Sequence, residues 1–242
     1  MAYAFQNTFY RCINLIDTNV EININGFGGN SGGAVFHSTF YGCTSIKKTP
    51  IINLPTWSLD SKYYASIFAN MFYSCSSLEE FRGDIAGIEN DININLPGNV
   101  FQNMFINCFK LKKAFNKLYP TGFNQNCFAN TFQNCMNLEE TPEIEIKNLP
   151  STNTFAMTFN GCVNLKKVNI KFNINSSILA TVFNNTFSGC ENIEEVSELK
   201  LNTTTFGSNA LQYLFQNCYK LKNVKISGHE TANATGLFTG LF

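Results

Sequence analysis

Phe155-Ala156-Met157-Thr158-Phe159-Asn160-Gly161-Cys162-Val163-Asn164-Leu165 is the stretch from which we deduce the fold. Its apolar and small side chains fall at positions i, i+3, i+4, i+7 and i+10, counted from Phe155 to Leu165. This spacing is typical of an amphipathic helix that buries one side. The stretch therefore predicts a short helix, with Phe155, Phe159 and Cys162 facing a core.

The same pattern recurs along the whole chain. Copies begin near residues 5, 36, 68, 101, 128, 155, 183 and 211, and a ninth begins near residue 238. Cysteine marks the same position in each of the first eight copies, at intervals of 27–33 residues, and only Cys127 lies outside this phase. A sustained period of this length indicates a repeat protein. We predict that residues 1–242 form a single solenoid of about eight repeats.

Each copy continues after its Leu or Ile with a charged pair and then with alternating polar and apolar residues, as in 165–170 and 221–226. Such alternation predicts a short strand. Because strands stack about 4.8 Å apart while helices pack about 8–10 Å apart, we expect a curved α/β solenoid. Parallel strands would line its concave face, and helices would line its convex face.

The aromatic and thiol positions of successive copies should meet in one continuous core, because a single copy can bury its apolar side only against its neighbours. The predicted core residues are Phe9, Cys12, Phe40, Cys43, Phe72, Cys75, Phe105, Cys108, Phe132, Cys135, Phe159, Cys162, Phe187, Cys190, Phe215 and Cys218.

The charged pair that follows each Leu or Ile alternates in sign from copy to copy. Because equivalent positions of adjacent copies lie side by side, opposite charges would attract and like charges would repel. Each exposed contact is worth about 0–1 kcal/mol, so we interpret this charge ladder as a device that sets the register, with simple solvation as the alternative. Its members are Lys47, Lys48, Glu79, Glu80, Lys112, Lys113, Glu139, Glu140, Lys166, Lys167, Glu194 and Glu195.

The repeat resembles the BspA-like leucine-rich repeats of bacterial and protist surface proteins, in which an aromatic-x-x-Cys-x-x-Leu core precedes a short strand. The resemblance extends from Phe5 to Phe242, and the Leu-x-x-Leu pattern is lost in copies such as 111–114 and 138–141. It implies an extracellular or cell-surface location. It also implies adhesion to a protein or glycan ligand on a host or neighbouring cell, without catalysis.

Composition excludes two classes of partner. Lys plus Arg and Asp plus Glu both total 17, so the formal net charge is +0 and a nucleic-acid partner is not expected. No apolar run approaches the length of about 18 residues that a transmembrane helix needs, so membrane insertion is not expected either. The first residues also lack the basic and apolar regions of a signal peptide.

The nine cysteines allow three interpretations: metal ligands, disulfides or core thiols. Zinc sites need closely spaced Cys or His pairs, and none is present. An odd number of cysteines cannot pair completely, and position i+7 places the thiols on the phenylalanine side, where free Cys acts as a small apolar residue. We favour core thiols and expect neither a metal nor a cofactor.

No catalytic residues are predicted. Gly29-Asn30-Ser31-Gly32-Gly33 matches a nucleophile elbow, but a nucleophilic serine needs a histidine base and an orienting carboxylate. The only histidines are His37 and His229. The same stretch lacks the Gly-Lys-Ser/Thr of a phosphate loop, so we interpret it as a connection. The serial glutamate pairs lie on one regular surface and cannot face each other across a cleft.

Aromatic residues outside the repeat pattern are candidate contacts, because Tyr and Trp are enriched at binding hot spots. We predict Trp57, Tyr63, Tyr64 and Tyr119 as binding aromatics, with loop packing as the alternative.

Two functions remain open. The first is a non-catalytic, surface-displayed interaction or adhesion module, and the second is a structural subunit that stacks head-to-tail into filaments or a sheath.

Overall fold

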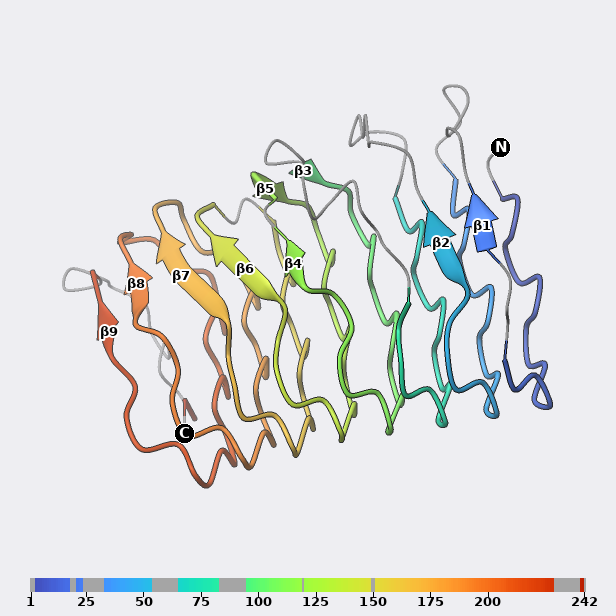
Figure 1. Ribbon diagram of the computed structural model, residues 1–242. Helices are drawn as coiled ribbons and strands as arrows, with labels where there is room; N and C mark the ends of the chain where they lie inside the picture. The colour runs from blue at the N-terminus through green and yellow to red at the C-terminus, as the bar shows by residue number, and fades with distance from the viewer. Residues whose placement is uncertain are drawn as a thin grey trace.

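The computed structural model describes residues 3–17, 21–23, 33–53, 65–82, 95–118, 120–148, 151–228 and 240–241. Within these ranges the copies lie side by side along one axis in sequence order (Figure 1). One wall of the stack carries the short strands, and the opposite wall carries the stretches that begin with phenylalanine. The chain is therefore a parallel β-solenoid.

The strands are short because only a few residues after each charged pair are extended. They are β1 (Glu21–Asn23), β2 (Ile51–Asn53), β3 (Asn95–Leu96), β4 (Lys117–Leu118), β5 (Gly122–Phe123), β6 (Glu143–Ile146), β7 (Ile170–Ile174), β8 (Leu199–Leu201) and β9 (Ile226–Ser227). All pairings are parallel, in the orders β1-β2, β3-β5 and β4-β6-β7-β8-β9.

The predicted helices are wrong: the described ranges contain no helix, and none therefore that could span a membrane. The stretch from Phe128 is a series of tight turns instead. Thr131 N–H donates to the Phe128 carbonyl, three residues back, and Cys135 N–H donates to the Phe132 carbonyl. The alternate residues donate to the next copy, as Phe132 N–H does to the Thr158 carbonyl at 2.8 Å.

The physical reason is that every fourth residue of these stretches has the left-handed backbone conformation, with positive φ. Asn126, Asn130 and Asn134 have φ of 55°, 55° and 60°, and Gly161 in the next copy has φ of 73°. This conformation interrupts a right-handed helix, and Asn and Gly adopt it more readily than other residues do. Each residue in the left-handed conformation bends the chain. As a result, the N–H groups of successive residues point alternately into the turn and toward the next copy.

The loss of the helices also removes the reason for the predicted curvature. Both walls now consist of backbone that hydrogen-bonds from copy to copy, so no wide helical layer opposes a narrow strand layer. The second phenylalanines of consecutive copies, from Phe9 to Phe215, stack with ring centroids 5.1–5.6 Å apart and planes within 10° of parallel. This spacing is close to that of the strands on the other wall.

The core lies between the two walls. From copy two onward, every predicted core phenylalanine and cysteine is at most 9% exposed. The thiols donate to the carbonyl of the second phenylalanine in the preceding copy, as Cys162 Sγ does to Phe132 at 3.1 Å. Buried threonines do the same with the first phenylalanine, as Thr158 Oγ1 does with Phe128 at 2.9 Å. These bonds satisfy polar groups that would be costly to bury alone.

Copy one departs from the predicted core. Phe9 is 36% exposed and Cys12 is also exposed. Both residues contact copy two on one side, where Phe9 stacks on Phe40. The physical reason is that an apolar residue of a stack is covered only when it has a neighbour on both sides.

This difference predicts the reactivity of the thiols. All nine cysteines are free, and burial raises the pKa of Cys43 to about 11 and that of Cys218 to about 12. Because the thiolate is the reactive form, we expect brief alkylation of the folded chain at neutral pH to modify Cys12 alone. Intact mass measurement should show one adduct, and nine after denaturation. Rapid modification of Cys108 or Cys162 would contradict the buried stack.

Candidate interaction face

The charge ladder occupies the positions where the chain enters its strand wall. Its second members pair across copies as parallel bridges: Lys48 with Glu80, Glu80 with Lys113, Glu140 with Lys167, and Lys167 with Glu195. The series also includes Asp17 before Lys48 and Asn223 after Glu195. We call these positions, together with the first members that precede them, the ladder column.

Ion pairs form between neighbouring copies in this column. Lys48 Nζ lies 3.0 Å from Glu80 Oε2, and Lys113 Nζ lies 2.8 Å from Glu140 Oε1. Lys167 approaches the other oxygen of Glu140 at 3.9 Å, and Lys222 lies 3.0 Å from Glu194. These side chains are about one-third to two-thirds exposed, so each pair adds little to stability.

Five first members of the ladder column have no such partner. Among the described residues, no acidic or basic group lies within ion-pair distance of the following side chains: Lys47, Glu79, Lys112, Glu139 and Lys166. The column therefore combines internally paired charges with charges that are free to meet another molecule.

A second alternating column lies on the strands, and the sequence analysis did not predict it. Glu145 of β6 pairs in register with Lys171 of β7. Leu199 pairs with Phe172, so Glu198 aligns with Lys171. Leu199 also pairs with Ile226, so Lys225 aligns with Glu198 and continues this strand column. Lys171 is also 3.8 Å from Glu143, and Lys225 is 3.1 Å from Glu198.

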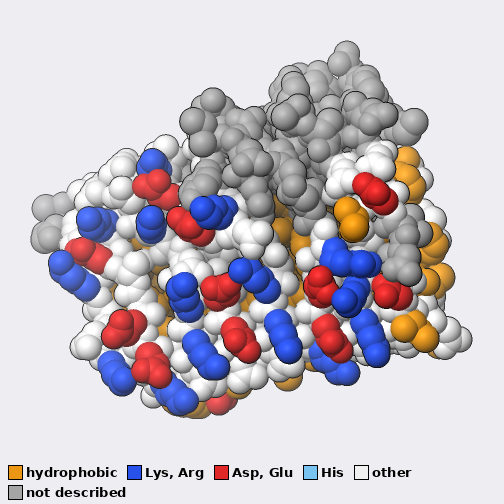
Figure 2. Space-filling model, in the orientation of Figure 1, with side chains coloured by type: hydrophobic (Ala, Val, Ile, Leu, Met, Phe, Trp, Pro, Cys, Tyr) orange, Lys and Arg blue, Asp and Glu red, His pale blue; other side chains and the backbone are white. Residues whose placement is uncertain are grey.

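The two columns have the same sign in each copy. The copy that begins at residue 128 is acidic in both, the next is basic, the next is acidic, and the copy that begins at 211 is basic. Within the two columns, each of these copies thus carries a stripe of one sign of charge, while Lys147 and Lys200 add the opposite sign further along the two acidic copies. Figure 2 shows the resulting alternation of blue and red side chains along the molecule. We call the surface formed by the whole ladder column, together with the strand column of these four copies, the striped face.

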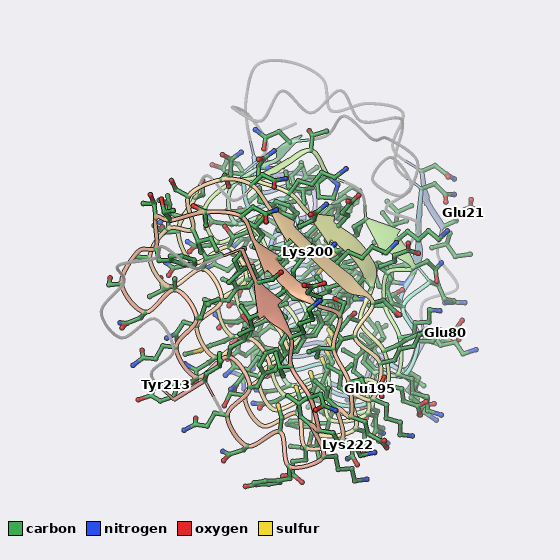
Figure 3. The ribbon with its side chains drawn as sticks, turned by 90° about the vertical axis from the view of Figure 1, so that its left-hand side faces the viewer. Glu21, Glu80, Glu195, Lys200, Tyr213 and Lys222 are labelled. Carbon is green, nitrogen blue, oxygen red and sulfur yellow. The ribbon has the colours of Figure 1, made fainter. Side chains whose placement is uncertain are left out.

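The view along the stack shows how the striped face is positioned. Glu80, Glu195 and Lys222 lie on the same side of the molecule, while Tyr213 lies on the turn wall at the other side (Figure 3). Shallow hollows lie between the stripes, one of them lined by Lys112, Lys113, Glu139, Glu140, Lys166 and Lys167. The face is thus a broad, polar and nearly open surface rather than an enclosed pocket.

The ion pairs keep the acidic stripes charged. A hydrogen bond from Lys113 lowers the pKa of Glu140, and a hydrogen bond from Lys222 lowers that of Glu194. Because the folded pKa is below the unfolded value, this contribution to stability is present at neutral pH. It is lost as the pH falls through the folded pKa of each carboxyl group.

The predicted binding aromatics are not placed. Trp57, Tyr63, Tyr64 and Tyr119 lie outside the described residues. The structure does show an unpredicted tyrosine row on the turn wall, in which Tyr10, Tyr41 and Tyr73 stack with centroids 4.9 and 4.7 Å apart. Stacking covers the ring faces of the middle tyrosine, so this row offers mainly phenol edges to a partner.

His37 is the one histidine among the described residues. His37 is held between Ser38 Oγ, at 3.0 Å, and Asn70 Nδ2, at 3.2 Å, and burial lowers its pKa. Ser31 and His229 lie outside the described residues. Within the described ranges, no group of three or more His, Cys, Asp or Glu side chains could hold a metal ion.

The chain is similar to solved structures of leucine-rich repeat proteins. A leucine-rich cell surface protein from Faecalibacterium prausnitzii is 17% identical over 96% of this chain and 79% of that chain, with a TM-score of 0.30. A leucine-rich repeat protein from Bacteroides ovatus is 14% identical over 88% of this chain and 64% of that chain, with a TM-score of 0.25. No protein-family model matches the chain, and neither does any curated protein sequence.

Proposed function

We propose that the chain is a non-catalytic adhesion module that binds a partner through the striped face. The observation that supports this proposal is a continuous, exposed and charge-patterned wall on a stack whose copies are hydrogen-bonded throughout the described residues. Repeat arrays provide extended binding surfaces of this kind. Display at a cell surface is what the resemblance to BspA-like repeats implies.

The chemistry of the face favours a protein ligand over a neutral glycan. A protein surface can supply both signs of charge, and Lys112 and Glu139, which have no ion-pair partner among the described residues, can contact a partner group of opposite sign. Electrostatic complementarity of this kind confers specificity and speeds association more than it adds affinity. We therefore expect binding that weakens as the salt concentration rises.

The proposal can be tested with arrays of extracellular proteins and glycans that also include the chain itself. The purified chain should bind a subset of the proteins. A variant that removes two stripes without changing the net charge, Lys112→Gln, Lys113→Gln, Glu139→Gln and Glu140→Gln, should lose this binding. Arg11→Gln with Glu191→Gln, which also preserves the net charge but lies outside both columns, should retain it. Equal binding by all three proteins, or no binding by any of them, would contradict the proposal.

Head-to-tail self-assembly is a second candidate, supported by the exposed apolar side chains of copy one. Ile13 is 53% exposed and Ile16 is 60% exposed, in addition to Phe9 and Cys12. Each copy donates N–H groups to the following copy, so the carbonyls on the outer side of copy one match the donors of another stack. A preceding copy in a longer chain would cover the same surface. Light scattering should show open-ended growth with concentration, and a strictly monomeric chain would exclude this assembly.

A further inference from the structure

When the charged pairs of the ladder column are read from the last copy to the first, every sign is the opposite of the sign read from the first copy to the last. From the copy that begins at residue 36 to the copy that begins at 183, the pairs are Lys, Glu, Lys, Glu, Lys and Glu. Read backwards, the order is Glu, Lys, Glu, Lys, Glu and Lys. The midpoint of this pattern lies between Lys112-Lys113 and Glu139-Glu140, so every pair on one side of it has a pair of opposite sign at the same distance on the other.

This antisymmetry selects one of the two ways in which two copies of the chain can meet face to face. Most homodimers have two-fold symmetry, so the same patch of each subunit forms the interface. A two-fold axis parallel to the stack would place Lys on Lys and Glu on Glu. An axis that crosses the stack at the midpoint places Lys112-Lys113 of one chain on Glu139-Glu140 of the other. It also places Lys166-Lys167 on Glu79-Glu80, and Lys47-Lys48 on Glu194-Glu195.

The spacing of the stripes also favours a second copy over a different protein. Opposite stripes remain aligned over several copies only if both surfaces have the same period along the stack, and another molecule of this chain has that period by construction. The free first members supply the charges for such contacts, because Lys112 and Glu139 lack an ion-pair partner among the described residues of their own chain. The formal net charge of +0 removes long-range repulsion between the two molecules.

We propose that the striped face binds the striped face of a second copy of the chain, antiparallel and related by a two-fold axis between copies four and five. This inference rests on the proposed role of the striped face and specifies the protein that it binds. Because exposed ion pairs are individually weak, the complex is a dissociable dimer.

Sedimentation velocity on the full chain provides the first test. A monomer–dimer equilibrium is expected, with no larger species, and the dimer dissociation constant should rise at least about tenfold between about 50 mM and about 500 mM salt, as screening removes the charge contacts. A chain that stays monomeric at high concentration and low salt would overturn the inference. Growth beyond the dimer would also overturn it and would favour end-to-end stacking.

Charge reversal gives a sharper result. Lys112→Glu with Lys113→Glu makes both central stripes acidic, and Glu139→Lys with Glu140→Lys makes both of them basic. Each variant alone should remain monomeric, whereas an equimolar mixture of the two should form a heterodimer. Arg11→Glu with Lys110→Glu changes the net charge by the same amount as the first variant, outside both columns, and should dimerise like the original chain. Circular dichroism and thermal melts confirm that each variant is folded.

Zero-length carbodiimide cross-linking determines the orientation. Within one chain Lys48 is 3.0 Å from Glu80, so that cross-link is the internal positive control. Lys48 and Glu195 are five copies apart in one chain, roughly 24 Å at the spacing of stacked strands. They meet only between antiparallel chains, so a Lys48–Glu195 cross-link in the dimer band is expected. A dimer band in which this cross-link is missing would overturn the antiparallel arrangement.

The two proposals fail in different ways. If the chain binds proteins on the array through its stripes but never dimerises, the self-recognition is wrong and the interaction role stands. If the neutralised variant binds as the original chain does, and the charge-reversed variants dimerise as it does, both proposals are wrong.

Discussion

Replacing Phe159 by alanine is expected to lower the free energy of unfolding by about 3–5 kcal/mol, as truncation of a fully buried aromatic residue does. Phe159 is 0% exposed, and its ring stacks between Phe132 and Phe187 at 5.3 and 5.4 Å. The backbone of this copy is hydrogen-bonded to the copies before and after it. The backbones of those copies therefore cannot move into the space that the ring leaves. Chemical denaturation followed by circular dichroism measures the change.

Lys166→Ala in the same copy is the matched control. Lys166 is exposed and makes no ion pair among the described residues, so its loss should change stability by less than about 1 kcal/mol. Comparable small effects from both substitutions would show that the phenylalanine stack does not hold adjacent copies together.

The repeat and the location of its core could be predicted from the sequence, because each copy presents the same side chains in the same phase. A residue such as Phe132 or Cys135 has only one environment available, between its equivalents in the adjacent copies. The sequence could not show how much of copy one is covered. That depends on neighbours on both sides rather than on residue type.

The prediction of a helix after each repeat start was wrong because a helix and a series of four-residue turns have the same spacing of apolar residues. Positions i, i+3, i+4 and i+7 lie on one side of a helix, and they also lie on one side of a chain that turns at every fourth residue. The distinguishing signal is an Asn or Gly two residues after most of the phenylalanines, at positions such as Asn103 and Asn107, where left-handed φ values occur. A regular series of Asn and Gly within an apolar period thus favours turns over a helix.

The ladder column was visible in the sequence, but the strand column was not. The ladder residues follow the Leu or Ile of each copy at a constant distance. Glu145, Lys171, Glu198 and Lys225 instead follow Leu138, Leu165, Ile193 and Leu221 by seven, six, five and four residues. Only the strand register aligns them, because it absorbs a shift of one residue from each copy to the next.

Substitutions at Asn103 should distinguish turns from a helix by the order of their effects. Asn103 has φ of 57°; its Nδ2 donates to Asn70 Oδ1 at 3.0 Å, and its Oδ1 accepts from Asn130 Nδ2 at 3.0 Å. Asn103→Ala loses both side-chain hydrogen bonds, at about 0.5–1.5 kcal/mol each. It also removes the short polar side chain by which Asn tolerates the left-handed conformation, which costs other L-residues about 1–2 kcal/mol. We therefore expect a loss of about 2–3 kcal/mol in the free energy of unfolding, after allowance for partial exposure.

Asn103→Gly loses the same hydrogen bonds but adopts the left-handed conformation without strain, so it should be less destabilising than Asn103→Ala. In a helix the order is the reverse, because glycine costs about 1 kcal/mol more than alanine. Denaturant titrations of the three proteins therefore test the fold itself, and a glycine variant less stable than the alanine variant would contradict the turn structure. The same order should hold at Asn130, where φ is 55° and the side chain donates to Asn103. Agreement at both positions would establish that the left-handed residues, rather than helical propensity, determine the path of the chain between its two phenylalanine rows.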